Sequence, residues 1–288
     1  MIAHVAAAGE GRGRVVLWLG SSAQTSSTAI DAAMLLARAY DSEVESLFVE
    51  DQQLFELAGL PFARIISSGE EGWRALPSVD LEREIHFVGA ALQRQIATTA
   101  REASVTYRSR VVRDDPMHAL ARACSETGPW NVVTIAEPFG AWKEERLRDL
   151  FSSVHGTTGV VIAGPMARRI QGPIIAVVEE IERLSPMLKV ADRINEATGG
   201  PVKLLLVGDR KDELAWLEGE ARLLFSDGEE TPFEVVLVER GDTPAVAETL
   251  RRHRAGFVLA QYGGLTVPAE GNLRPLSCAL ECPLLIVR

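Results

Sequence analysis

The sequence predicts an α/β protein in which two doubly wound parallel sheets of five strands each follow one another along the chain. Short apolar runs alternate with amphipathic segments, which is typical of buried parallel strands and of the helices that cover them. The same order of strands and helices occurs twice, before and after residues 165–172. A chain of 288 residues is long enough for two such domains, each with its own core.

We expect the chain to divide into a flexible N-terminal segment (1–13), a first domain (14–164), a linker (165–172) and a second domain (173–288). The linker lies in a stretch with glycine and proline, GPMARRIQG, that interrupts the alternation of strands and helices. Two tandem copies of one fold predict an internal pseudo-dimer.

In the first domain, each predicted strand is a short, mostly apolar run bounded by residues typical of turns. The strands are Val15–Leu19, Val44–Glu50, Tyr107–Val112, Asn131–Ala136 and Thr158–Ala163. The first helix follows the loop Gly20–Thr28, in which Ser26 or Ser27 is a good N-cap. Pro116 predicts the start of another helix, because proline is tolerated in the first helical turn. A charged helix at 143–151 precedes the last strand.

A long helix is predicted from about Leu81 to Ala103, because apolar residues recur there at helical spacing. This stripe consists of Leu81, Ile85, Val88, Leu92, Ile96 and Ala100. We interpret it as a core-facing stripe; the alternative is a face that binds a partner.

Residues 51–79 form an insertion that the second domain lacks. Its apolar residues are Leu54, Phe55, Leu57, Leu60 and Phe62. We expect these residues to keep the insertion partly ordered, as either a lid over the first sheet edge or an interaction loop.

The second domain repeats the same pattern. Its predicted strands are Ile174–Val178, Val202–Val207, Phe233–Glu239, Gly256–Ala260 and Pro283–Arg288. A helix is expected to start at Ser185 and to end at Gly199-Gly200, since glycine commonly terminates helices. Two further helices are predicted at Lys211–Phe225 and Ala245–Arg254.

The formal net charge of −10 argues against unspecific binding of nucleic acid or anionic membranes. No apolar run approaches the roughly 18 residues that are needed to cross a bilayer. The N-terminus lacks the basic start and long apolar stretch of a secretory signal. We therefore predict a cytoplasmic protein with no nucleic-acid partner and no membrane insertion.

The three cysteines, Cys124, Cys278 and Cys282, show no paired framework, which indicates a reducing compartment. Cys278 and Cys282 have the spacing to share a helical face. A metal site would need two more ligands, and no histidine lies near these cysteines in the sequence. We interpret the cysteines as small buried hydrophobic residues and predict no metal site.

Four segments indicate a family: Val238–Leu250 (VERGDTPAVAETL), Glu281–Arg288 (ECPLLIVR), Leu47–Asp51 (LFVED) and Arg113–Pro116 (RDDP). With them the chain resembles a tandem universal stress protein, of the adenine-nucleotide alpha-hydrolase-like group. The resemblance implies a sheet ordered 3-2-1-4-5 in each half. It also implies that the two fifth strands pair, as they do across the family's dimer interface, but here within one chain.

ATP-binding members of that family carry an Asp after the first strand and a Gly-x2-Gly-x9-Gly-Ser/Thr loop after the fourth. Ligands of open parallel sheets bind where the strand order reverses, which here is between strands one and four. In the first half the Asp position is Gly20, and the loop contains only Gly140 together with Trp142 and Glu144-Glu145. We therefore predict no nucleotide site in the first half. The loop from Gly20 to Thr28 is either an ordinary strand-to-helix turn or a donor of hydrogen bonds to an anion.

In the second half, the resemblance places Glu179 at the acidic position. The loop after the fourth strand contains Gly263, Gly264, Gly271 and Asn272, although its glycine spacing differs from the family pattern. These five residues are our candidate cofactor-binding site, for ATP or AMP. The alternative is that Glu179 is a surface charge and that the glycines only shape a turn.

Sequence signatures of catalysis are missing. The sequence contains neither a Gly-x-Ser-x-Gly elbow nor an adenylation signature, and its five histidines are scattered. We predict a non-enzymatic protein of stress-linked regulation that acts through a protein partner. The alternatives are an adenine-nucleotide sensor that uses the second domain and a weak nucleotide hydrolase. A homodimer is a further alternative for the assembly.

Overall fold

The computed structural model confirms the α/β class. It describes residues 13–20, 26–65, 74–75, 78–126, 130–135, 145–154, 157–224, 234–238, 243–270 and 273–288. The expected flexible segment 1–13 lies outside these residues, apart from Gly13.

The first half contributes five strands to one large sheet: β1 (Arg14–Leu19), β2 (Glu43–Asp51), β5 (Tyr107–Asp114), β6 (Asn131–Ile135) and β7 (Thr157–Ile162). The second half contributes β8 (Ile174–Val178), β9 (Val202–Val207), β10 (Glu234–Val238), β11 (Phe257–Gln261) and β12 (Leu284–Val287). The sheet order is β10-β9-β8-β11-β12-β7-β6-β1-β2-β5. With the strands counted separately in each half, this is the order 3-2-1-4-5 twice.

The two predicted five-stranded sheets are joined into a single ten-stranded mixed sheet, through the pairing of the fifth strands that the resemblance implied. The fifth strands β7 and β12 pair antiparallel, and Val160 lies opposite Ile286. Both strands are almost entirely buried, so pairing removes two apolar edges that would otherwise be open to other chains. All other pairs in this sheet are parallel.

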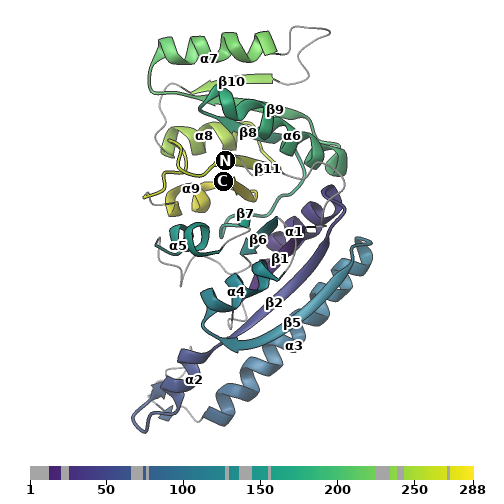
Figure 1. Cartoon of the computed structure of the whole chain (residues 1–288), viewed down its shortest axis with the longest axis vertical. Helices are drawn as coiled ribbons and strands as arrows, with labels where there is room; N and C mark the ends of the chain where they lie inside the picture. Colours follow the sequence, from purple (N-terminus) through teal and green to yellow (C-terminus); the bar gives the residue numbers. More distant parts are fainter. Residues whose placement is uncertain are drawn as a thin grey trace.

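Helices cover both faces of the sheet, as a doubly wound fold requires (Figure 1). One face carries α1 (Ser27–Ala39), α3 (Ser78–Glu102), α6 (Ile181–Thr198) and α7 (Lys211–Leu224). The other carries α4 (Pro116–Ser125), α5 (Glu145–Ser153), α8 (Thr243–Arg252) and α9 (Arg274–Ala279). Alternate residues of β1 enter the two cores: Val15 faces the first group of helices and Val16 the second.

Several local predictions are confirmed. The Ser26 hydroxyl caps α1 by accepting the Ala29 N–H, and Gly199 ends α6 with a φ of 69°. In the α3 stripe, Ile85, Leu92, Ile96 and Ala100 are buried, so the core interpretation of that face holds.

Two predictions about helices are wrong. Helix α6 begins at Ile181 and not at Ser185, because the fully buried Leu184 packs in the core and extends the helix upstream. Cys278 and Cys282 do not share a helical face, since α9 ends at Ala279. The chain is already extended at Leu280, just before the last strand.

The insertion and the first turns of α3 (Ser78–Glu102) form a projecting element that we call the arm. It consists of α2 (Gln52–Ala58), the hairpin of β3 (Arg64–Ile65) and β4 (Arg74–Ala75), and α3 through residue 88. Figure 1 shows the arm beyond the ends of β2 and β5, at one extremity of the molecule. Of the five apolar residues expected to order the insertion, Phe55 is half-buried against the core, whereas Leu54, Leu57, Leu60 and Phe62 are exposed.

Candidate functional site

Glu179 lies at the point in the second half where the order of the strands reverses. It directly follows β8, whose neighbours in the sheet are β9 on one side and β11 on the other. Because helices leave β8 and β11 toward opposite faces, the carboxyl ends of these strands form the usual ligand crevice of an open sheet.

The loop that follows β11 is tight. Gly263 has a φ of 87°, a conformation that favours glycine, and its N–H donates to the Val267 carbonyl at 2.8 Å. The Tyr262 N–H donates to the Val287 carbonyl at 2.8 Å, which ties the loop to the adjacent strand β12. These two backbone hydrogen bonds help to hold the loop in one shape.

The Glu179 carboxylate binds this loop directly. Its Oε1 accepts the Thr266 N–H at 2.7 Å, and its Oε2 accepts the Leu265 N–H. Gly264 lies against the same carboxylate, so a Cβ at this position would collide with Oε2. Thr266 is buried, and among the described residues its hydroxyl has no hydrogen-bond partner.

The structure thus brings together three of the five predicted site residues: Glu179, Gly263 and Gly264. Gly271 and Asn272 lie outside the described residues. Leu265 and Thr266, whose N–H groups carry the contact, were not singled out from the sequence. Backbone donors leave no residue-type signal, so only the position of the loop could have indicated them.

The first-half counterpart is described only at Gly20, which follows β1. Gly140, Trp142 and Glu144 lie outside the described residues, as do residues 21–25. The prediction that this half binds no nucleotide therefore stays a prediction.

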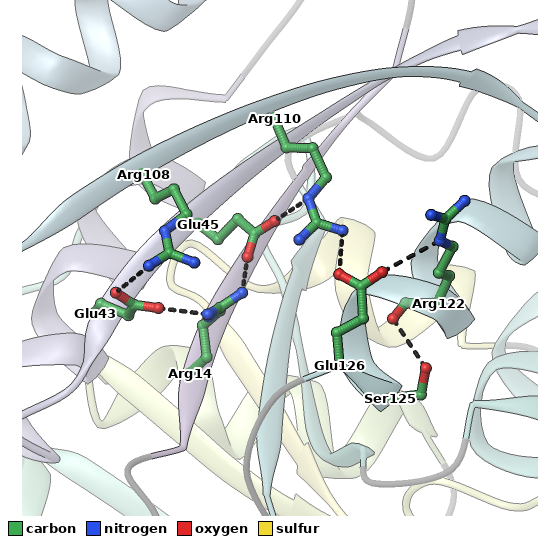
Figure 2. Close-up of polar contacts among 8 residues, drawn as sticks. All are labelled: Arg14, Glu43, Glu45, Arg108, Arg110, Arg122, Ser125 and Glu126. Carbon is green, nitrogen blue, oxygen red and sulfur yellow. Dashed lines mark hydrogen bonds and ion pairs between the residues drawn. The ribbon is translucent and has the colours of Figure 1, made fainter.

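A second polar constellation, which sequence reasoning missed, joins the starts of β1, β2 and β5 to the end of α4 (Figure 2). Its members are Arg14, Glu43, Glu45, Arg108, Arg110, Glu126 and Arg122. Glu45 is fully buried and lies between the guanidinium groups of Arg14 and Arg110, the latter at 2.7 Å. Burial lowers the pKa of Arg14, and the Glu43 carboxylate partly opposes that shift.

This network lies at the amino ends of β1, β2 and β5. Because β7 and β12 pair antiparallel, these ends lie on the same edge of the ten-stranded sheet as the carboxyl end of β8, where Glu179 lies. Each carboxylate bridges two guanidinium groups, so the network holds the edge strand β5 to the centre of the sheet. The signal in the sequence was Glu45 within an apolar strand, because a buried carboxylate requires a cationic partner.

A third cluster fastens the arm to the sheet. The buried Glu50, at the end of β2, accepts a hydrogen bond from Arg113 Nε at 3.0 Å and lies 2.8 Å from His86 Nε2. Arg113 also donates to Glu82 at 2.6 Å, and this bond lowers the pKa of Glu82. The Arg113 guanidinium lies 3.9 Å from the centre of the Phe55 ring. Together these contacts attach both α2 and α3 to β5.

Cys124 and Cys282 are buried as predicted, whereas Cys278 is half-buried. Burial raises the pKa of the Cys124 thiol to about 11 and that of the Cys282 thiol to about 12, so both are protonated near neutral pH. Within the described part of the chain, no three histidine, cysteine or acidic side chains gather as metal ligands would.

Comparisons with known proteins agree with this architecture. Neither a protein-family model nor a curated protein matches the chain. Among solved structures, a universal stress protein from Archaeoglobus fulgidus matches with a TM-score of 0.59 and 12% identity, over 96% of each chain. A functionally unknown protein from Pseudomonas aeruginosa matches with a TM-score of 0.57 and 13% identity, over 96% of this chain and 92% of that one.

A third solved structure, the cytoplasmic domain of a prokaryotic cation chloride cotransporter, matches with a TM-score of 0.54 and 8% identity. The match covers 96% of this chain and 95% of that one. The chain therefore has the tandem universal stress protein fold that the sequence predicted, and at these identities the likeness concerns the fold alone. Within the described residues, none of the helices is long and apolar enough to cross a membrane.

Proposed function

We propose that this chain is a non-enzymatic, cytoplasmic protein of stress-linked regulation that acts by binding a protein partner through its arm. The observation that carries the proposal is the exposure of large apolar side chains there. Phe62 and Phe87 are each 71% exposed, and Leu57 is 55% exposed. Leu54, Leu60 and Val79 of the arm are exposed as well.

Such a concentration of apolar groups on one projecting element is typical of a protein-binding surface. The arm is also fixed in place, because Arg113 joins Phe55, Glu50 and Glu82. A fixed apolar surface loses little conformational freedom when a partner binds. Of the two roles that we predicted for the insertion, this geometry favours the interaction loop over the lid.

Site-specific photo-crosslinking tests this proposal. A photoreactive residue at position 62 is expected to give a discrete crosslinked partner in stressed cells, whereas the same residue at position 223 gives none. Leu223 is a suitable control because it is 67% exposed but lies on α7, at the other end of the molecule (Figure 1). A product that contains only this chain would indicate a homodimer.

The purified partner then allows a quantitative test. Phe62→Ser combined with Phe87→Ser should weaken its binding by about tenfold or more, since buried aromatic anchors dominate interface energetics. Leu223→Ser should leave binding unchanged. Equal crosslinking from positions 62 and 223, or unchanged affinity of the double variant, would refute the proposal.

A second candidate function is an adenine-nucleotide sensor that uses the second half. The observation in its favour is the position of Glu179 and the Gly263 loop at the point where the strand order reverses. Acid extraction of purified protein, followed by chromatography, should then release ATP or AMP in near-stoichiometric amount. No released nucleotide, together with no thermal shift on adding millimolar ATP, would rule out the sensor.

The enzyme alternative is a weak nucleotide hydrolase. It would need ATP turnover above a matched blank that is abolished by Glu179→Ala. We expect no such turnover, in keeping with the non-enzymatic proposal.

A further inference from the structure

The Glu179 carboxylate occupies the loop after β11 in the way that a bound anion would. We propose that this loop, residues 263–266, is an oxyanion site that the chain fills with its own Glu179, so that a phosphate group binds there only after the carboxylate has left. The inference deepens the nucleotide-sensor candidate, and the identity of the natural ligand rests on that candidate. The closure of the loop by Glu179 does not depend on it.

The first support is the arrangement of the donors. The N–H groups of two consecutive residues, Leu265 and Thr266, point to the two oxygens of one carboxylate. Successive backbone N–H groups that converge in this way form a concave site for anions, which is the arrangement that phosphate groups use in many proteins. The site lies at the carboxyl edge of β8 and β11, where ligands of this type of sheet bind.

The second support is Gly264. Among the described glycines, the positive φ values belong to Gly172, Gly199 and Gly263. The backbone at Gly264 therefore does not itself require glycine. The position is restricted by Glu179, because a Cβ at Gly264 would collide with Oε2 of the carboxylate. The loop thus leaves room for an anion in direct contact with Gly264, and in this structure that anion is the Glu179 carboxylate.

The third support is an unused donor. The side chain of Thr266 is 1% exposed, and its hydroxyl has no hydrogen-bond partner among the described residues. Both oxygens of the Glu179 carboxylate are already engaged by N–H groups. A phosphate group has more acceptor oxygens than a carboxylate, so it can use a hydroxyl that the carboxylate leaves without a partner.

Electrostatics make the two occupants mutually exclusive. Within the described ranges, no cationic side chain forms an ion pair with Glu179; Arg183 pairs with Glu180 instead. The negative charge of Glu179 is therefore stabilised there by the N–H groups of Leu265 and Thr266. A phosphate placed on the same N–H groups would lie next to a second negative charge, which strongly disfavours both. Removal of the carboxylate eliminates this repulsion and frees both donors at once.

Titration of inorganic phosphate into wild type, Glu179→Ala and Glu179→Gln tests the inference. The readouts are the amide signals of Leu265 and Thr266 in ¹⁵N NMR spectra and the unfolding midpoint. In wild type, millimolar phosphate should leave both amide signals in place. In Glu179→Ala the signals should shift with saturation, and phosphate should bind about tenfold or more tightly than to wild type. Phosphate should also raise the unfolding midpoint of that variant.

Glu182→Ala is the matched control, because Glu182 is an exposed carboxylate in the first turn of α6, three residues after Glu179. It should behave as wild type. Glu179→Gln removes the charge but keeps the size of the side chain, so it replaces Glu179→Ala if that variant does not fold. It should also bind phosphate more tightly than wild type.

Two results would overturn the inference: equal phosphate binding by wild type and the Glu179 variants, or no phosphate-dependent amide shift in any folded Glu179 variant. The sensor candidate is judged separately, by nucleotide extraction from wild type. Phosphate binding by Glu179→Ala, with neither released nucleotide nor a thermal shift on adding millimolar ATP in wild type, would support the closed site and refute the sensor.

Discussion

At the scale of single residues, the most consequential finding is that charged side chains select partners far away in the sequence. Glu179 binds the backbone 86 and 87 residues later, and Glu45 lies between Arg14 and Arg110. Each of these carboxylates sits in or next to an apolar strand and draws its donors from a neighbouring strand or loop. Three predictions follow at this scale.

Replacing Glu45 should strongly destabilise the fold. Glu45→Ala leaves the buried Arg14 without one of its carboxylate partners, and loss of one member of a buried ion pair costs about 3–5 kcal/mol. Urea unfolding should report a fall of that size in the free energy of unfolding. Glu126→Ala, at the 39%-exposed end of the same network, should cost less than about 1 kcal/mol. Equal losses in the two variants would contradict this account.

Two glycine substitutions should change stability in opposite directions. Gly264→Ala places a Cβ against Glu179 Oε2, so the carboxylate must move away from the loop and about 1–3 kcal/mol of stability should be lost. Gly219→Ala lies within α7, where an added Cβ meets no atom within 4 Å, and should stabilise the protein by about 0.5–1 kcal/mol. Thermal unfolding of both variants measures the difference, and a stabilised Gly264→Ala would refute the contact.

The buried thiols predict a loss of stability in alkaline solution. The folded-state pKa values of Cys124 and Cys282, about 11 and about 12, exceed the ordinary value of 9.0. Above pH 9.0 the unfolded thiols ionise while the folded ones keep their protons, so stability is complete below that pH and falls as the pH rises further. Unfolding free energies measured from about pH 8 to about pH 10 should decline, by at most about 1.4 kcal/mol per pH unit for each thiol. The double variant Cys124→Ala/Cys282→Ala should decline less steeply; an unchanged slope would count against the thiols.

At the scale of elements, the arm shows how an insertion can be ordered by polar contacts when its apolar side chains face solvent. Arg113 on β5 joins Glu50 of β2, Glu82 of α3 and the Phe55 ring of α2. We expected the apolar residues of the insertion to order it by packing. Phe55 fits this expectation because it is half-buried against the core, but Phe62 does not, because its side chain is exposed.

Arg113→Ala should release the arm while the sheet stays folded. Hydrogen exchange of α2 amides should become faster, because three elements lose their shared contact. Exchange in β8 and β11 should not change. His118→Ala is the control, since His118 pairs with the adjacent Asp114 but does not touch the arm residues. Rapid proteolysis across the whole insertion in the wild type would contradict the ordered arm itself.

At the scale of the whole molecule, the two halves share one sheet and one continuous core on each face. Helices α1 and α6 lie in contact across the join, and the Thr28 hydroxyl donates to the Ala167 carbonyl at 2.9 Å. In the predicted linker, the N–H groups of Arg168 and Arg169 donate to the Glu281 carbonyl. This segment is therefore packed against the second half and does not act as a free tether.

The shared sheet predicts that both halves unfold together. In urea, hydrogen-exchange protection of β1 and of β8 should disappear at the same concentration, because separation would expose the edges of β7 and β12. Val160→Pro should reduce the stability of both halves, since proline removes a ladder hydrogen bond next to Ile286. Two separate transitions in the wild type would show that the join contributes little.

The sequence alone determined the strands and most of the helices, because alternating apolar runs and amphipathic helices report local burial directly. The strand order of each half came from the resemblance to universal stress proteins. The same resemblance placed Glu179, Gly263 and Gly264 at one point of the sheet, where strands one and four diverge. The tertiary structure decided what these groups do: Glu179 accepts the N–H groups of Leu265 and Thr266. It also decided that Glu45 is buried between arginines and that Phe62 is exposed. Local sequence patterns could not decide these contacts. Which group pairs with a charged side chain, and whether an apolar side chain is buried, depend on which distant segments become neighbours in the fold.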